Sequence, residues 1–243
     1  VPLITALNSL IARLKSSLIR SEDFIVEAAH RVRTPLATVR TQAEVIHRGL
    51  EKSKNKTALR EMIRAIDESS RSAGQLLDHA MVNFRADQFQ TEAIDLRKLM
   101  AETVERLSPT AELKDISIIT QDQGGDFDFD GDPILLQNAL RNILDNAIKY
   151  SPADSDITVT LARDAHNHIL SITDQGRGFA GANLSDHLQR FKRGTNVHDI
   201  VGSGLGLTIV DEVARAHGGR VEITNHTDLE GGGACVSLYL PLV

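Results

Sequence analysis

Two long stretches of the chain repeat apolar residues at intervals of three and four, and a short polar segment separates them. The first stretch begins near the N-terminus, where one helix face would carry Leu7, Leu10, Leu14 and Leu18. The second occupies residues 59–84 and includes Met62 and Ile63 on its apolar face. This spacing predicts two amphipathic helices, and the polar segment RGLEKSKNKTA predicts the turn between them.

An antiparallel helical hairpin has one apolar stripe on each helix and little of its own to cover them. Two hairpins that pair into a four-helix bundle would bury all the stripes, so we expect a homodimer. We assign this helical domain to residues 1–88, with residues 1–20 as a coiled-coil connector.

Beyond residue 90 the pattern changes to alternating strand-like segments and three helical ones. The clearest helix is PILLQNALRNILDNAIKYS, with Asp132 as its expected cap and Pro133 near its start. We expect an α+β two-layer sandwich over residues 93–243, a mixed sheet with helices on one face.

Composition excludes several classes of protein. The single cysteine, Cys235, cannot form an internal disulfide or a thiolate zinc cluster, and it fits a reducing compartment. With 4% aromatic residues, no Trp and a net charge of -6, the chain lacks the basic, aromatic stripe of a nucleic-acid binder. It begins on valine and has no run of about 20 apolar residues, so we expect a soluble fragment of a longer protein whose upstream part carries any membrane anchor.

Three motifs in the second half suggest phosphate chemistry, although each has an ordinary structural alternative. DQGRGF (Asp174–Phe179) and GSGLGL (Gly202–Leu207) are glycine-rich, and glycines that open a helix let backbone amides approach a phosphate. In NILDNAIKY, Asn142 and Asn146 lie four residues apart on one helix face, which suits a hydrated magnesium ion or a plain polar surface. A Rossmann arrangement does not fit, because no hydrophobic first strand precedes the second glycine motif.

Together with Phe191 and Arg193 in FKRG, which lie between the two glycine-rich motifs, these three motifs resemble the N, G1, F and G2 boxes of the GHKL (Bergerat) nucleotide-binding domain, in the same order and at similar intervals. With HRVRTPL upstream on a helical hairpin, nearly the whole chain resembles the catalytic core of a bacterial two-component sensor histidine kinase. The resemblance implies ATP and Mg²⁺ as ligands, a response-regulator receiver domain and a second copy of the chain as partners, and a cytoplasmic location in an inner-membrane sensor. It implies no direct nucleic-acid binding.

The resemblance also implies roles for individual residues of the nucleotide domain. Asp174 would accept a hydrogen bond from the adenine amino group, and Tyr150 would flank the base. Asn146 would bind magnesium with Asn142 beside it, and Lys149 would approach phosphate. Arg193 would reach the transferring phosphates, with Arg190 and Lys192 as weaker candidates, and Phe191 would anchor a lid over the site. The glycines would form the turn after Asp174, the hinges of the lid and the amides that face phosphate, namely Gly176, Gly178, Gly202, Gly204 and Gly206.

In the helical domain the resemblance marks His30 as the phosphoacceptor, because a neutral imidazole is a good nucleophile near neutral pH. Thr34, about 6 Å further along the helix axis, would orient a water for dephosphorylation of the regulator. Pro35 would bend the helix beside His30.

Arg31 departs from the family pattern, which has an acidic residue directly after the histidine. A guanidinium cannot take the imidazole proton. Three readings stay open: autophosphorylation is slow, Glu27 substitutes as the base, or Arg31 binds the phosphoryl group. The first would make the chain a phosphatase-biased scaffold.

The leading prediction is a kinase core that autophosphorylates His30 and passes the phosphoryl group to an aspartate. A second alternative is a GHKL ATPase of the chaperone or topoisomerase type. In those proteins a glutamate that activates water opens the N box, whereas this chain has Asn142, which cannot act as a base.

Overall fold

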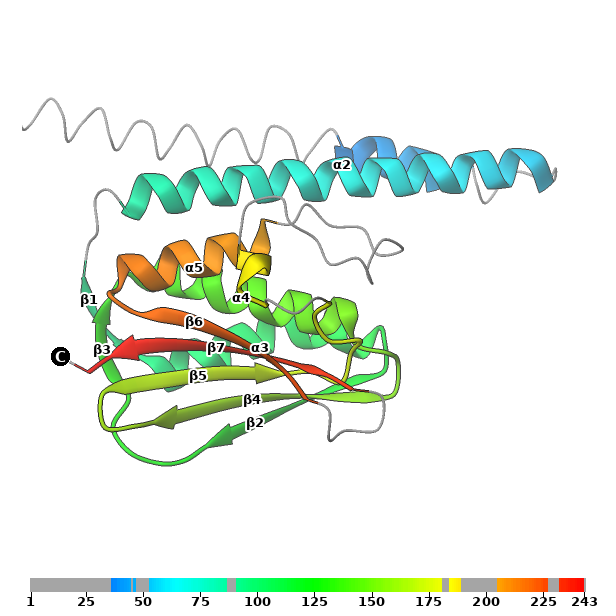
Figure 1. The fold of residues 1–243 in the computed structure, drawn as a ribbon. Coiled ribbons are helices and arrows are strands. Elements are labelled where there is room, and N and C mark those ends of the chain that lie inside the picture. Colours follow the sequence, from blue (N-terminus) through cyan, green and yellow to red (C-terminus); the bar gives the residue numbers. More distant parts are fainter. Residues whose placement is uncertain are drawn as a thin grey trace, which may run out of the picture. The chain divides into compact units, whose positions relative to one another are not determined.

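The computed structural model describes residues 36–44, 46, 53–86, 91–180, 184–188, 205–226 and 232–242 (Figure 1). The chain divides into two compact units, Val1–Phe84 and Arg85–Val243. Among the helices of the described residues, none is long and apolar enough to cross a membrane.

The described residues of the first unit are helical, as expected. Residues 36–44 form one helix and Ser53–Ala86 form α2. Arg40 Nη1 lies 3.2 Å from Asp67 Oδ1, so these two helices run side by side. The predicted turn is shorter than expected, because residues 53–58 already belong to α2; the Lys and Ala residues of this segment are good helix formers.

In the second unit the described residues form two sheets and three helices with one 3₁₀ turn. The elements in chain order are β1 (Glu92–Asp95), α3 (Leu96–Glu112), β2 (Ile116–Asp122), β3 (Asp128–Gly131), α4 (Pro133–Tyr150), β4 (Ser155–Arg163), β5 (Asn167–Thr173), η1 (Leu184–Leu188), α5 (Gly206–Ala216), β6 (Arg220–Asn225) and β7 (Ala234–Pro241).

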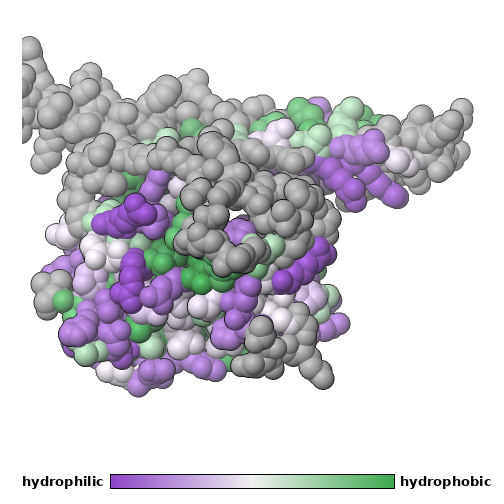
Figure 2. Space-filling view, in the orientation of Figure 1, coloured by the Kyte–Doolittle hydropathy of each residue, from purple (hydrophilic) through white to green (hydrophobic). Residues whose placement is uncertain are grey.

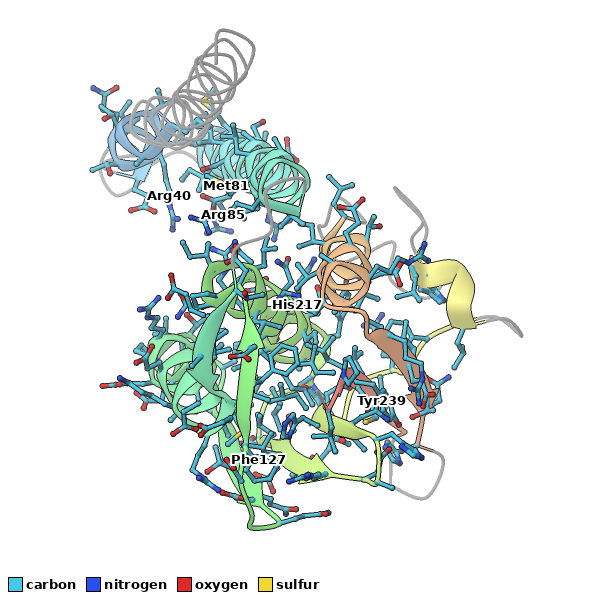
Figure 3. All side chains as sticks on the ribbon, turned by 90° about the vertical axis from the view of Figure 1, so that its left-hand side faces the viewer. Arg40, Met81, Arg85, Phe127, His217 and Tyr239 are labelled. Carbon is cyan, nitrogen blue, oxygen red and sulfur yellow. The ribbon has the colours of Figure 1, made fainter. Side chains whose placement is uncertain are left out.

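The main sheet has the strand order β2-β4-β5-β7-β6, and β2 pairs with β4 in the parallel sense while the other neighbours are antiparallel. Alternate residues of β4, β5 and β7 are buried, and α3, α4 and α5 cover that face (Figure 1). The other face carries short polar side chains such as Ser171 and Ser237, whose hydroxyls lie 2.8 Å apart. At its edge Arg220 stacks 4.0 Å from the ring centroid of Tyr239 (Figure 3). The expected two-layer sandwich is therefore confirmed.

Strand β1 was not expected from the sequence, because its surroundings read as a polar run. It pairs antiparallel with β3, and Ile94 lies opposite Phe129. Of its four residues only Ile94 is buried. A four-residue strand with one inward side chain has too little periodicity to be recognised.

The start of α4 is capped as predicted. Asp132 Oδ1 accepts hydrogen bonds from the backbone N–H groups of Ile134 and Leu135, and Pro133 occupies the first turn. Its other oxygen, Oδ2, accepts from Arg85 Nη1 at 2.9 Å. This almost fully buried carboxylate thus satisfies two orphan amides of the helix and neutralises a cation.

His217 links the end of α5 to the start of α4. Its Nε2 accepts a hydrogen bond from the Asp132 backbone N–H at 3.0 Å, and its Nδ1 lies 2.8 Å from the carbonyl of Val213. Because Nε2 must accept, the proton resides on Nδ1. Figure 3 shows His217 in the interior, where its ring also contacts Phe129. Burial lowers the pKa of His217, against the opposing effects of the Val213 bond and the Asp132 charge.

A second buried histidine, His168 on β5, packs between the rings of Phe127 and Phe129. It is 3% exposed, and its Nδ1 has no hydrogen-bond partner among the described residues. Burial is the main cause that lowers the pKa of His168, and the charge of Arg163 adds to it. The imidazole is therefore held neutral in the folded protein.

We predict that the protein loses stability below about pH 6.5. The unfolded chain binds a proton at each of these histidines near pH 6.5, whereas the folded chain does so only at lower pH, so the free energy of unfolding falls as the pH decreases through this window. Urea unfolding at pH 7.5 and 5.5 measures the fall. The decrease in the free energy of unfolding between these pH values should be smaller in His168→Phe. His166 is exposed, so His166→Gln is the control and should leave the decrease as in the wild type. An unchanged fall in His168→Phe would contradict the assignment.

Candidate functional site

Helix α4 carries Asn142 and Asn146, the two asparagines of the NILDNAIKY motif, on the side that faces α5. Asn142 is 8% exposed, and its Nδ2 donates to the carbonyl of Asn138 at 2.8 Å. A Cβ built on Gly206, the first residue of α5, would lie 3.2 Å from Asn146 Nδ2 and 3.3 Å from Asn142 Oδ1. The side chains of both asparagines therefore meet the start of α5.

The last turn of α4 holds Lys149 and Tyr150 next to each other. The Lys149 ammonium lies 4.9 Å from the centroid of the Tyr150 ring, within the range of a cation–π contact. The predicted base-flanking and phosphate-contacting residues thus touch in this structure.

A lysine far from these motifs in sequence holds the end of the same helix. Lys114 Nζ donates to the carbonyls of Ile148, Lys149 and Ser151 at 2.7, 3.1 and 3.2 Å. An ammonium has three protons, and here each finds a carbonyl at the negative end of the helix dipole. Burial lowers the pKa of Lys114. Sequence reasoning missed this residue, because nothing in the segment AELKDIS indicates which helix end it reaches.

Asp174 follows β5 and is 8% exposed. Its Oδ1 accepts hydrogen bonds from the backbone N–H groups of Gly176 at 2.8 Å and Ala234 at 3.2 Å. Its own N–H donates to the Ala234 carbonyl at 2.8 Å. Burial raises the pKa of Asp174, while the two backbone bonds and the nearby His226 oppose the rise. The carboxylate is rigidly oriented and poorly solvated.

Residues 174–179, here named the glycine turn, pass close to the end of α4. A Cβ on Gly176 would lie 2.7 Å from the Tyr150 carbonyl oxygen, closer than side chains approach backbone. Glycine at this position therefore lets the turn and Asp174 sit directly against the Tyr150 backbone.

The start of α5 completes the arrangement. Leu205 precedes the helix, and among the described residues no side chain accepts a hydrogen bond from its first amides. Thr208 Oγ1 in the first turn donates to the carbonyl of Leu188 at 3.1 Å, which ties α5 to η1. Uncapped amides at the positive end of a helix are suited to binding an anion.

The structure thus brings together part of the predicted set around the second half of α4, namely Asn142, Asn146, Lys149, Tyr150, Asp174, Gly176, Gly178 and Gly206. The other predicted residues lie outside the described part of the chain, namely Glu27, His30, Arg31, Thr34, Pro35, Arg190, Phe191, Lys192, Arg193, Gly202 and Gly204, and so does the connector predicted over residues 1–20.

The side chains at this site could bind Mg²⁺ through a few oxygen ligands only, so most of the coordination of the ion would come from waters and phosphate. Within the described residues, no group of three or more His, Cys, Asp or Glu side chains gathers to hold a metal. The amide oxygens of Asn142 and Asn146 are hard ligands of the kind that Mg²⁺ accepts alongside waters and phosphate oxygens. The helix start supplies anion-binding amides beside them.

Comparison with known families divides the chain into two matched regions. Residues 131–243 match the model described as "Histidine kinase-, DNA gyrase B-, and HSP90-like ATPase". Residues 20–82 match the "His Kinase A (phospho-acceptor) domain".

Curated relatives match over almost the whole of this chain. Sensor protein QseC of Salmonella typhi is 34% identical over 232 residues, which cover 95% of this chain and 50% of QseC. Sensor protein BasS of Escherichia coli is 28% identical over 237 residues, covering 97% of this chain and 63% of BasS. The chain thus spans about half the length of QseC and less than two thirds of BasS.

Two solved structures are also similar to this chain. The mycobacterial sensor histidine kinase MprB is 30% identical with a TM-score of 0.57, and the match covers 62% of this chain and 97% of that one. The full-length ShkA structure in complex with AMPPNP has a TM-score of 0.62 at 21% identity, covering 91% of this chain and 46% of ShkA, and shares the fold.

We predict that Lys114→Met destabilises the protein by about 2 kcal/mol, because methionine keeps the length of the side chain but removes the charge and the donors to the three carbonyls. Chemical denaturation measures the loss. Lys98 is exposed in the first turn of α3, so Lys98→Met is a matched control that should change stability by less than about 0.5 kcal/mol. Equal effects of the two substitutions would show that the Lys114 hydrogen bonds do not stabilise the end of α4.

Proposed function

Because this chain belongs to the sensor histidine kinases, the ATP-dependent protein-histidine kinases of two-component systems, we propose that it binds Mg-ATP beside α4 and phosphorylates His30. The observation that carries the proposal is the convergence of Asn142, Asn146 and Asp174 with the uncapped start of α5. These groups come from three segments, and each suits a different part of one nucleotide.

Asp174 would recognise the adenine amino group. Within the described residues, both hydrogen bonds to its carboxylate end on Oδ1, so Oδ2 is the oxygen that would accept from the base. An anionic acceptor favours the amino group of adenine over the carbonyl of guanine. The raised pKa of this carboxyl adds a pH dependence: the binding-competent anion is lost at higher pH than for an ordinary aspartate.

The phosphate end would be held by charge and backbone amides. Asn146 would bind Mg²⁺ with Asn142 beside it, Lys149 would reach a phosphate, and the first amides of α5 at Gly206 would bind phosphate oxygens. Magnesium would neutralise the phosphates and align them. Phe191, Arg193, Gly202 and Gly204 would add the lid, with Arg193 on the transferring phosphate.

The transfer itself would be an in-line displacement. A nitrogen of the His30 imidazole attacks the γ-phosphorus, ADP leaves, and the imidazole proton passes to a base. We assign this base to Glu27 or water, since Arg31 cannot serve. The nucleotide domain supplies positioning and charge stabilisation only.

The phosphoryl group would pass to an aspartate of a response-regulator receiver domain, and the helical region would dock it. We propose domain extents of 1–88 for dimerisation and phosphotransfer, with residues 1–20 as the connector, and 93–243 for nucleotide binding. We place both in the cytoplasm as part of an inner-membrane sensor.

A homodimer is supported by apolar side chains that one copy leaves exposed. Val39, Ile46 and Met62 are 45%, 56% and 55% exposed in the helical unit, and Figure 2 shows apolar residues on its surface. A second copy would cover such a face, as in a four-helix bundle.

A phosphatase-biased activity is the second candidate, and Arg31 is the observation that favours it. A slow kinase could still use Thr34 to orient a water against the phosphorylated regulator. An ATPase without phosphotransfer is disfavoured by the phospho-acceptor domain that matches residues 20–82.

We predict that γ-labelled ATP with Mg²⁺ labels the protein with an acid-labile, alkali-stable group, as expected for a phosphoramidate. His30→Gln should abolish the label and leave ATP affinity nearly intact, because the phosphoacceptor and the nucleotide site lie on separate domains. Label that survives acid would indicate Ser or Thr instead. A trace of label together with rapid dephosphorylation of the regulator would select the phosphatase-biased alternative.

We predict that Asp174→Asn weakens ATP binding about tenfold and reduces the preference for ATP over GTP, because a charge-assisted hydrogen bond is replaced by an amide that can rotate to suit either base. Calorimetric titration with both nucleotides measures the two effects. Asp156 on β4 is exposed, so Asp156→Asn is a matched control. Wild-type affinity in Asp174→Asn would refute the base contact.

A further inference from the structure

One cross-strand pair of the β6–β7 ladder holds both ends of the glycine turn. Asn225 and Ala234 are register partners in this ladder. The Ala234 N–H donates to the Asp174 side chain at Oδ1, and the Ala234 carbonyl accepts from the Asp174 backbone N–H. The other end of the turn, at Phe179, is held by Asn225.

The Asn225 side chain pairs with Phe179 as a neighbouring strand would. Its Oδ1 accepts from the Phe179 N–H at 2.8 Å, and its Nδ2 donates to the Phe179 carbonyl at 2.8 Å. A planar amide with one acceptor and one donor side by side can satisfy both backbone groups at once. A carboxylate of the same shape offers acceptors only.

The turn is shaped to receive this side chain. Gly178 has φ 64°, in the left-handed region that favours glycine, and a Cβ there would lie 2.9 Å from Asn225 Oδ1 and 3.3 Å from the Gly233 carbonyl oxygen. The other glycine of the turn, Gly176, lies against Tyr150 on α4. The turn is therefore enclosed between the end of α4 and the β6–β7 hairpin.

We infer that Asn225 is a positioning residue of the nucleotide site, which sets the path of the glycine turn and through it the orientation of Asp174 toward the base. Asn225 itself is exposed at the end of β6, and both hydrogen bonds that its side chain makes within the described residues reach the turn. Its contribution is thus to the geometry of the turn more than to the packing of the core. The inference rests on the proposed function, because ATP is the ligand whose binding reports the geometry.

The sharpest test is the isosteric substitution Asn225→Asp, with Asn225→Ala as a second variant. The carboxylate would lose the donated bond and face the Phe179 carbonyl, an acceptor against an acceptor. We expect KM for ATP in autophosphorylation to rise roughly tenfold in Asn225→Asp and less in Asn225→Ala. The rate at saturating ATP and the unfolding temperature of the nucleotide-free protein should stay near those of the wild type.

Asn167 provides the matched control, since its side chain also bonds within a turn, to Asp164 between β4 and β5. Asn167→Ala should leave KM for ATP unchanged. Wild-type KM in both Asn225 variants would overturn the inference, as would a loss of saturating rate and unfolding temperature without a rise in KM. Failure of the wild-type protein to bind ATP in calorimetry would overturn the proposed function itself and is distinguishable from either result.

Discussion

Helix α4 is held at both ends by hydrogen bonds to side chains, two of which are distant in sequence, and the arrangement of the site depends on these bonds. Asp132 satisfies the first amides, and His217 joins that cap to the end of α5. At the other end Lys114 satisfies three carbonyls. A helix whose orphan groups are paired within the fold keeps a defined length and direction, so the residues on its surface keep a defined position.

The two helices of the site are coupled by the same contacts. His217 ends α5 and binds the residue that starts α4, while Gly206 begins α5 against Asn142 and Asn146. The two helices therefore meet at both ends of α5. A change in the spacing of α4 and α5 at one end would be transmitted to the other end, because packed helices move as rigid elements.

Electrostatics and close packing work together at the glycine turn. Asp174 is removed from water, which raises its pKa, and two backbone N–H groups compensate part of that cost. The turn approaches both Tyr150 and Asn225 more closely than a side chain at its glycines would allow. A buried, oriented carboxylate is suited to discriminating between ligands, because leaving it without a hydrogen-bond donor would be costly.

The sequence by itself determined most of the elements and the motifs of the site. The apolar periodicities predicted the helices and the strands of the main sheet, and Asp132 and Pro133 marked the start of α4, because these signals act between residues close in sequence. Asn142 and Asn146 could be placed on one face for the same reason.

Only the tertiary structure decided which distant groups meet. Strand β1, the Lys114 contacts, the His217 link and the Asn225 pairing with Phe179 all join segments far apart in the chain. No local preference encodes such a pairing, since Lys114 and Asn225 look like any polar residue of a surface segment. Their roles arise when the folded backbone brings the carbonyls of a helix end and the backbone groups of a turn within hydrogen-bonding distance of them.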